Sequence, residues 1–246
     1  SWFQNGVTGQ TPNQSPAQLG DALLNDTNGN QWALVGSEIT AESLGCVADY
    51  NKITFTGTDN NLSLTAFYKS TAAKVGVFGG QSYFVSGGDG HEITNPTSLR
   101  GRGTRFGTTI YYGGTGNKSV KTQATHPNDG LDDPLSVALW VRNSNVHMQD
   151  FVVSNVFDVS NPLDYGSDWD AGMMTSYGFL THDRVRVLGY WRVRGLLFDV
   201  TRNNGNCDGC TLNDGWYQGF WGAALIGPKL ESGQTEIQVG DTRGGG

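Results

Sequence analysis

The sequence predicts an all-β protein built as a solenoid of stacked short strands, with one short α-helix at its N-terminal end. Glycine occupies 36 of the 246 positions, about twice its usual share of ~7%. Only five residues are Glu and six are Lys, although long helices are built largely from these residues together with Ala and Leu. Aromatic residues make up 11% of the chain, which is too many for a disordered protein.

A repeat of four similar segments predicts the stacked coils. The segments share an apolar position that recurs after 34, 23 and 27 residues, at Leu139, Met173, Leu196 and Ala223. A second set follows the first three segments and comprises Asn145–Met148, Arg184–Val187 and Cys210–Leu212. A period of 23–27 residues with two or three short strands per unit is typical of a β-solenoid, because each coil buries its apolar face only by stacking on the next.

The longest gap in this repeat predicts a loop inserted at Asn155–Trp169. Insertions on one face of a solenoid often build its binding surface. A β-sandwich is the second candidate fold, but it needs strands every ~8–12 residues joined by hairpin turns. The longer period and the predicted helix argue against it. A leucine-rich repeat fits less well, because no ladder of regularly spaced leucines is present.

Residues 61–75 are the one segment with a convincing helical pattern. Apolar side chains recur at helical spacing from Leu64 onward, Asn60 or Asn61 can cap the start, and Gly76 follows as a stop signal. We expect this helix to cover the N-terminal end of the first coil, which otherwise exposes an apolar face and an unpaired edge.

The sequence divides into two regions. Residues 1–45 are rich in Gly, Asn, Gln and Thr, and are predicted to form an N-terminal arm or neck. Residues 46–246 are predicted to form the solenoid. The chain begins with Ser1 rather than Met and ends in three glycines at Gly246, so we expect a processed or truncated piece whose coils continue beyond this point.

The charge distribution argues against two classes of partner. The net charge is −7, the pI is about 4.9, and no run of Lys or Arg is present. A surface that binds a nucleic acid duplex is therefore not expected. No apolar run approaches the ~20 residues that a membrane-spanning helix needs, so membrane insertion is not expected either.

Several familiar catalytic and cofactor motifs are incomplete. Gly101–Gly107 has spaced glycines but lacks the Gly-Lys-Ser/Thr of a phosphate-binding loop. The four histidines are scattered, no Gly-x-Ser-x-Gly elbow is present, and His147 and His182 are expected to point outward. Cys207 and Cys210 form one CxxC without a second pair, which favours a structural role over zinc or redox chemistry. We expect no cofactor and no resident metal.

Carboxylates are the stronger chemical signal. Asp168 and Asp170 flank a tryptophan, and Asp199 follows about one coil later. Glycoside hydrolysis uses two carboxyl groups ~5–9.5 Å apart, and residues i and i+2 of a strand share a face with α-carbons ~6.5 Å apart. These three residues are the candidate catalytic acids. The alternative is a structural or sugar-binding role, because Asp is also a common turn residue.

Aromatic side chains concentrate in the same part of the chain. Sugar C–H faces pack on aromatic rings, so these residues are candidates for substrate binding, and they are Trp169, Trp191, Trp216, Tyr217 and Trp221. A place in the core is the alternative for each of them. Trp216 and Tyr217 are adjacent, and adjacent strand residues face opposite sides, so at least one of these two rings is expected to point outward.

Arginines alternate with valines over residues 184–194. The period of two predicts a half-buried strand with the valines inside and the arginines outside. The arginines then form either a solvated face that can pair with Asp183 or Asp199, a groove for an acidic polysaccharide, or a contact between subunits. Arg192 is the candidate substrate-binding residue among them. Beside the three aspartates it can also serve a calcium-dependent lyase, which needs a carboxylate cluster and a basic residue.

The order of several motifs carries a family resemblance. The first four are Lys74–Phe78 (Lys-x-Gly-x-Phe), Tyr83–Ser86 (Tyr-Phe-Val-Ser), Ser98–Gly103 (Ser-Leu-Arg-Gly-x-Gly) and Thr108–Tyr111 (Thr-x-Ile-Tyr). The later three are Asp168–Gly172 (Asp-Trp-Asp-Ala-Gly), Val185–Trp191 (Val-x-Val-x-Gly-Tyr-Trp) and Phe198–Thr201 (Phe-Asp-Val-Thr). Together they resemble the pectate-lyase-like right-handed parallel β-helix proteins over residues 45–230, and most of all those of bacteriophage tailspikes.

This resemblance implies a function and a location. Such tailspikes are homotrimers of the virion tail that are assembled in the host cytoplasm and act outside the cell, where they adhere to the host. They bind bacterial surface polysaccharide, either capsule or O-antigen, and cleave it as endoglycosidases, and they contact other tail proteins. The resemblance therefore implies a polysaccharide depolymerase. The alternatives are a non-catalytic trimeric adhesin or shaft fragment and a calcium-dependent polysaccharide lyase.

Overall fold

The chain is mostly β-structure with a single α-helix in its described part, as the composition predicts. The computed structural model describes residues 2–5, 23–25, 31–34, 37–103, 107–118, 134–156, 167–176, 178–198, 209–218, 224–226 and 237–239. Within these ranges the α-helix is α2 (Asn61–Ser70), and a short 3₁₀ helix, η1 (Ala41–Leu44), precedes it. The predicted all-β class is confirmed.

Three parallel sheets make up most of the structure. Sheet I contains β4 (Glu38–Thr40), β5 (Val75–Val77), β8 (Thr97–Arg100), β12 (Val146–Gln149), β16 (Leu180–Asp183), β19 (Cys210–Asn213) and β22 (Ile237–Val239). Sheet II contains β6 (Ser82–Val85), β9 (Thr108–Tyr112), β13 (Phe151–Asn155), β17 (Arg186–Leu188) and β20 (Trp216–Tyr217). Sheet III contains β7 (His91–Ile93), β11 (Val137–Val141), β15 (Ala171–Thr175), β18 (Arg194–Phe198) and β21 (Ala224–Ile226).

Two smaller sheets complete the list of strands. β10 (Gly114–Thr115) and β14 (Ser167–Asp168) pair in parallel between sheets II and III. β1 (Trp2–Asn5), β2 (Leu23–Asn25) and β3 (Gln31–Leu34) form an antiparallel sheet in the predicted arm. β4 also lies within the range predicted for the arm, yet it pairs in parallel with β5. The parallel structure therefore begins before residue 46.

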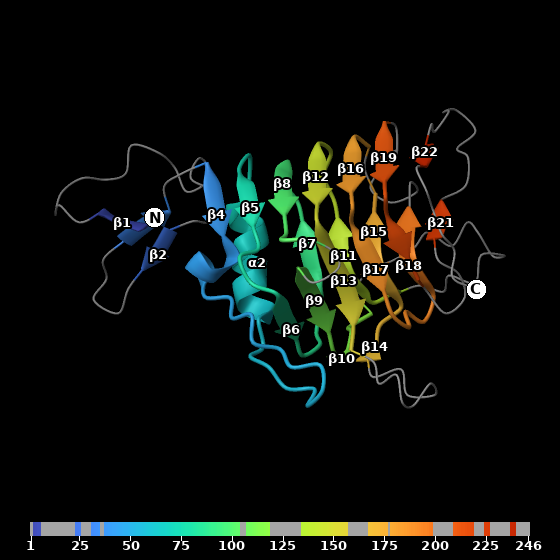
Figure 1. Cartoon of the computed structure of the whole chain (residues 1–246). Coiled ribbons are helices and arrows are strands. Elements are labelled where there is room, and N and C mark those ends of the chain that lie inside the picture. Colours follow the sequence, from blue (N-terminus) through green and yellow to red (C-terminus); the bar gives the residue numbers. More distant parts are fainter. Residues whose placement is uncertain are drawn as a thin grey trace.

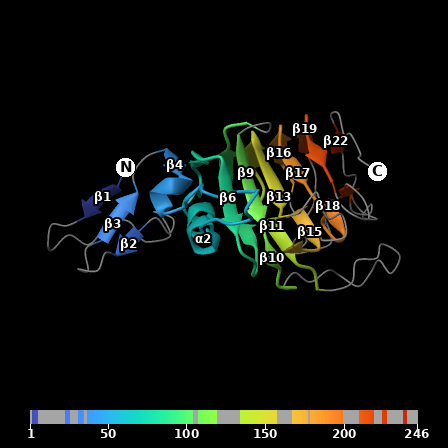
Figure 2. The same ribbon diagram turned by 60° about the horizontal axis from the view of Figure 1, so that its bottom comes forward.

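From β5 onward the chain visits the three sheets in a fixed order. It passes through sheet I, then sheet II, then sheet III, and each return adds one strand in parallel to the last one in the same sheet. We call each such passage a coil. The colours in Figure 1 accordingly run in sequence order along the stack of strands, and Figure 2 shows the same stack turned.

The predicted repeat corresponds to the register of sheet III. Leu139 pairs with Met173, and Met173 with Leu196, as the 34- and 23-residue spacings predict. The last member differs by one position, because Leu196 pairs with Ala224 rather than with Ala223. The register is strict because a slip of one residue would turn every inward side chain outward.

The second predicted set is wrong in one member. β12 pairs with β16, so Val146 lies beside Leu180 and not beside the segment 184–187. That segment contributes β17 to sheet II, where Val187 pairs with Val153 and Tyr217. Val alternates with Arg or His in both sheets, because each sheet has one buried and one outward face. The alternation alone therefore did not show to which sheet the segment 184–187 belongs.

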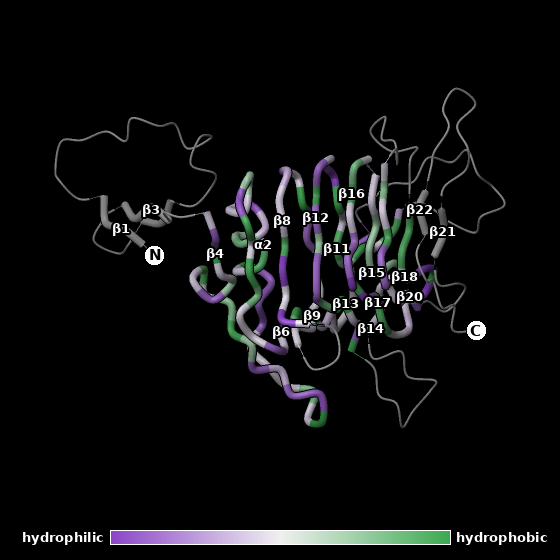
Figure 3. The backbone as a smooth tube through the Cα atoms, turned by 45° about the horizontal axis from the view of Figure 1, so that its top comes forward, coloured by the Kyte–Doolittle hydropathy of each residue, from purple (hydrophilic) through white to green (hydrophobic). Residues whose placement is uncertain are grey.

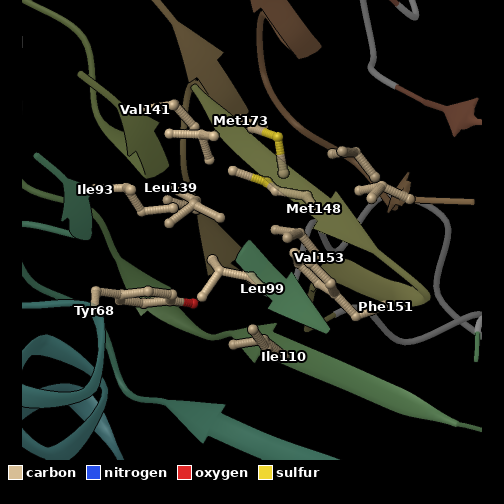
Figure 4. Packing of buried hydrophobic residues seen from close by; sticks show 14 of the residues in the cluster. Tyr68, Ile93, Leu99, Ile110, Leu139, Val141, Met148, Phe151, Val153 and Met173 are labelled. Atoms are coloured by element: carbon tan, nitrogen blue, oxygen red, sulfur yellow. The ribbon is translucent and has the colours of Figure 1, made fainter. Parts of the chain in front are cut away.

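Side chains from all three sheets meet in one core. Figure 4 shows these side chains pointing toward one another, among them Leu139, Met173, Met148 and Val153, all fully buried. In sheet I, buried residues alternate with more exposed ones along β8, β12, β16 and β19, and Figure 3 shows hydrophobic and hydrophilic stretches of the backbone side by side in the stack. Each coil thus buries its inward side chains against the coils before and after it, which is why no single coil is stable alone.

Helix α2 lies at the N-terminal end of sheets II and III. Its buried side chains Leu64, Phe67 and Tyr68 join the core, and the helix contacts β7, the first strand of sheet III. It ends at Ser70 rather than at residue 75. Gly76 is not its stop signal but lies within β5, where an added Cβ would come within 2.8 Å of Phe67 and Leu99. Glycine is needed there because the helix packs directly on the strand.

Two corners of each coil are tight turns that use the left-handed backbone region. Between sheets I and II, positive φ values occur at the equivalent positions Asp150, Arg184 and Asp214. Between sheets III and I they occur at Asn145, Phe179 and Gly209, each directly before a strand of sheet I. Only the last of these six is glycine, although the left-handed region costs other residues roughly 1–2 kcal/mol.

The two histidines of sheet I point in opposite directions. His147 is exposed, as expected, but His182 is fully buried and the expectation that it points outward is wrong. It occupies an inward position of β16 between Met148 and Leu212. Its Nδ1 lies 3.2 Å from the hydroxyl of Tyr217.

Candidate functional site

The third corner, between sheets II and III, carries the long connections. After β9 the chain takes residues 113–136 to reach β11, and after β13 it takes residues 156–170 to reach β15. The predicted insertion is therefore one of two that emerge from the same corner in successive coils. β10 and β14 pair within these connections, at the lower edge of Figure 1. We call the described residues of this region the II–III corner.

Asp168 and Asp170 both lie at the II–III corner but do not share a face. β14 ends at Asp168, whose side chain is 48% exposed, whereas that of Asp170 is 3% exposed. The expectation that the two acids share one face of a strand is therefore wrong, because β14 ends at Asp168. One arginine nevertheless contacts both, since Arg192 pairs with Asp168 through Nη2 and lies 3.8 Å from Asp170 through Nε.

The carboxylate of Asp170 is held by the preceding coil. Its Oδ2 accepts hydrogen bonds from the backbone N–H of Ser136 at 2.8 Å and from the Ser136 hydroxyl at 3.0 Å. Lys118 Nζ lies 3.7 Å from the same oxygen. A buried carboxylate is stable only when it is paired and hydrogen-bonded, and these contacts meet that need. Asp170 therefore links β11, β15 and the turn that carries Arg192.

Trp169 is part of the core rather than of an exposed face. Its ring is fully buried, packs edge-on against Tyr112 at 5.5 Å, and donates from Nε1 to the carbonyl of Gly113 at 3.0 Å. An added Cβ at Gly116 would overlap the ring. A ring without exposed surface cannot stack on a sugar, so the predicted substrate contact through Trp169 is corrected to a structural role. It anchors the segment that carries both aspartates.

Two further predicted substrate-binding rings are also buried. Trp191 is fully buried and lies against the backbone of Gly172, and Tyr217 is buried beside His182. Both are corrected to core positions for the same reason as Trp169. Aromatic enrichment did not distinguish the core from a binding surface, because large rings fill the interior of stacked coils equally well.

Among the predicted substrate-binding rings in the described part of the chain, Trp216 is the one that is partly exposed. It faces outward from β20 while Tyr217 faces inward, as their adjacency predicts. The guanidinium of Arg186, its register partner in β17, lies 6.0 Å from the ring centroid. Asp199 and Trp221, the remaining predicted site residues, lie outside the described residues.

The predicted alternation of valine and arginine is confirmed only in part. Val185, Val187 and Val193 are buried, but the arginines do not form one continuous outward row, because Arg184 and Arg192 pair with acids at different corners. Arg184 contacts Asp150 through Nε at 2.7 Å and through Nη2 at 3.0 Å, and its Nη1 contacts the expected partner Asp183 at 2.9 Å. This guanidinium lowers the pKa of Asp150 below its usual value. Arg192 instead belongs to the II–III corner.

Sequence reasoning missed four polar residues of the II–III corner. They are Lys118 and Ser136, which contact Asp170, and Asn117 and Asp89, which contact each other. Asn117 donates to Asp89 at 2.8 Å. Asn117, Lys118 and Ser136 lie within the long connection between β9 and β11, and Asp89 lies at the same corner one coil earlier.

No candidate metal or membrane element is present in the described part of the chain. Three or more His, Cys, Asp or Glu side chains do not gather anywhere within these ranges. None of the described helices is long and apolar enough to cross a membrane. Cys210 opens β19 and is buried, while Cys207 lies outside the described residues.

Comparisons with known proteins do not assign the chain to a family. No protein-family model, no curated protein and no solved structure matches it. The functional interpretation therefore depends on the parallel-sheet architecture and on the residues of the II–III corner.

Proposed function

We propose that this protein is a tailspike-like right-handed parallel β-helix that binds a bacterial surface polysaccharide, capsule or O-antigen, and hydrolyses it at the II–III corner. The observation that carries this proposal is the pair of long connections at one corner of successive coils. They bring Asp168 and Asp170 to the same guanidinium, Arg192. Long insertions on one face of a stacked repeat commonly form its binding surface.

The two aspartates have different roles in this proposal. Asp168 is exposed, lies beside Arg192 and can reach a bound sugar, as a base or a nucleophile must. Asp170 is buried and holds Arg192 and Ser136 in position. Hydrolysis also requires a proton donor, for which Asp89 and Asp199 are the candidates.

Purified chain incubated with a panel of bacterial capsular polysaccharides and O-polysaccharides tests this proposal. We expect one polysaccharide to be shortened, without the ultraviolet absorbance of the unsaturated sugar that a lyase leaves. Asp168→Asn should lower the rate roughly 10²–10⁴-fold and leave the free energy of unfolding unchanged. Asp214→Asn is the matched control, because Asp214 is exposed and lies at another corner; its rate should equal that of the parent chain. Equal rates in both variants would exclude Asp168 from catalysis.

A non-catalytic adhesin or shaft is the second candidate function. It is favoured by the ion pair of Asp168 with Arg192 and by the burial of Trp169 and Trp191, which leave fewer free groups at the corner. In that case a polysaccharide is bound but never shortened. The lyase alternative has no support from the described residues, since they contain no cluster of metal ligands.

The same proposal includes assembly and location. A homotrimer in the virion tail, in contact with other tail proteins, would place the II–III corner of each copy outside the cell. Mass measurement of the purified chain in solution tests the trimer directly, and a mass equal to one chain at all concentrations would contradict it.

A further inference from the structure

The outer face of sheet I carries a row of polar side chains in strict register. Ser98, His147, Thr181 and Thr211 are paired neighbours on β8, β12, β16 and β19. Adjacent strands lie ~4.8 Å apart, so the row presents one hydrogen-bonding group at each such step. Within the described part of the chain, these four side chains form no hydrogen bond. They are therefore available to a ligand that lies across the strands.

The charges beside this row are already paired. In the next outward row, Arg100 pairs with Glu38 at 3.1 Å, and Asp183 pairs with Arg184 at 2.9 Å. The remaining outward positions of this row on β12 and β19 are the uncharged Gln149 and Asn213. Such a surface offers no excess of cations to an acidic polymer.

One exposed aromatic ring borders the row. Phe179 lies directly before β16, two residues from Thr181, and its side chain is 59% exposed. Its φ of 55° lies in the left-handed region, which is uncommon for a bulky residue. The ring lies over the backbone of Gly209 in the next coil. The left-handed corner itself recurs at Asn145 and Gly209 and belongs to the fold. The large exposed ring, in contrast, is found only at Phe179 among these three positions.

A ring beside regularly spaced hydrogen-bonding groups fits a sugar polymer. The ring can stack on the C–H face of a pyranose, and the side chains of Thr181 and Thr211 can bond hydroxyl groups of the next residues. We propose that the outer face of sheet I from β8 to β19, bordered by Phe179, is a secondary binding surface for an extended, uncharged polysaccharide. This inference rests on the proposed function, but the surface is separate from the II–III corner.

Affinity electrophoresis in gels that contain either neutral-sugar O-polysaccharides or uronic-acid capsules measures binding to this surface. Phe179→Asn should weaken binding of a neutral polysaccharide about tenfold or more. Its free energy of unfolding should not fall, because Asn tolerates the left-handed region, so lost binding cannot be ascribed to misfolding. The double variant Thr181→Val, Thr211→Val removes two hydroxyls, keeps the β-branched shape, and should weaken binding about tenfold.

Two variants serve as controls. Leu62→Gln alters an exposed apolar residue of α2, outside the proposed surface on β8 to β19, and should bind as the parent chain does. Arg192→Ala alters the II–III corner and should leave binding to sheet I largely intact while cleavage falls.

The remaining outcomes overturn the inference in distinguishable ways. Weakened binding only in Arg192→Ala would reject the sheet I surface and leave the proposed function standing. Unchanged binding in Phe179→Asn and in the double threonine variant would do the same. Binding of acidic capsules alone would reject an uncharged ligand. No binding of any polysaccharide would reject both the surface and the proposed function.

Discussion

At the scale of single residues, the II–III corner is held in place by a buried ring that packs closely on the backbone, and not by its reactive side chains. Trp169 packs on the backbone of Gly116 and donates to the carbonyl of Gly113. This contact fixes the segment in which Asp168 precedes the tryptophan and is exposed, while Asp170 follows it and is buried. The corner therefore depends on a residue that carries no reactive group.

Substitution of Gly116 by Ala tests this dependence. The added methyl group would overlap the Trp169 ring, and overpacking of this kind typically costs ~1–3 kcal/mol. We expect the free energy of unfolding, measured by urea titration, to fall by about that amount. Thr115→Ala is the matched control, since Thr115 is the exposed neighbouring residue, and it should change stability little. Equal stability in the two variants would show that the ring can move away without cost.

Sequence reasoning predicted strands more successfully than turns or rings. The recurrence of Leu139, Met173 and Leu196 predicted the register of sheet III, because each coil must place an apolar residue at the same inward position. The left-handed turn at Phe179 was not predictable, because such a turn is normally predicted from a glycine in the sequence. The burial of Trp169 and Trp191 was not predictable either, because large aromatic rings occur both in protein cores and on sugar-binding surfaces.

At the scale of elements, α2 replaces a missing coil at the N-terminal end of the stack. Among the described strands, none precedes β6 in sheet II or β7 in sheet III, and α2 brings Leu64, Phe67 and Tyr68 to that end of the core. Further attachment comes from His91 in β7, whose Nε2 lies 3.1 Å from the carbonyl oxygen of Asn61. The helix is thus part of the first coil and not an independent unit.

Phe67→Asp tests the importance of this helix. The change places a carboxylate in the core beside Phe78, whose ring centroid lies 4.9 Å from that of Phe67, and it removes a buried aromatic side chain. We expect a loss of at least ~3 kcal/mol, seen as a lower urea midpoint and faster proteolysis. Leu62→Asp on the exposed side of the same helix is the control and should be close to neutral, because an acid in the first turn suits the helix dipole. Similar effects of the two changes would contradict a capping role.

At the scale of the whole molecule, two buried histidines make the stacked coils sensitive to acid. Burial lowers the pKa of His91 to about 4 and that of His182 to about 3, from an ordinary value of 6.5. His91 lies against Tyr112, Tyr68 and the backbone of Asn61, with the carboxylate of Asp59 nearby. His182 lies against Tyr217, with His147 as the neighbouring cation when it is protonated.

The direction of the pH effect follows from these pKa values. Between pH 6.5 and about 4 the unfolded chain binds protons at both histidines while the folded chain does not, so stability must fall as the pH is lowered through this window. The slope approaches ~1.4 kcal/mol per pH unit for each histidine. The paired carboxylates, such as Asp150, act in the same direction but at lower pH, because their pKa values lie below 3.8.

Urea unfolding at pH 7.5, 6.0 and 5.0 measures this dependence, and His182→Phe separates its sources. The substitution retains a buried ring and removes one titrating group, so the loss of stability between pH 6 and 5 should be about half that of the parent chain. Thr181→Val, at the neighbouring outward position, is the control and should leave the slope unchanged. An equal slope in His182→Phe and in the parent chain would mean that His182 can be protonated in the folded state. The acid sensitivity would then have to come from other groups, among them His91 at the junction with α2.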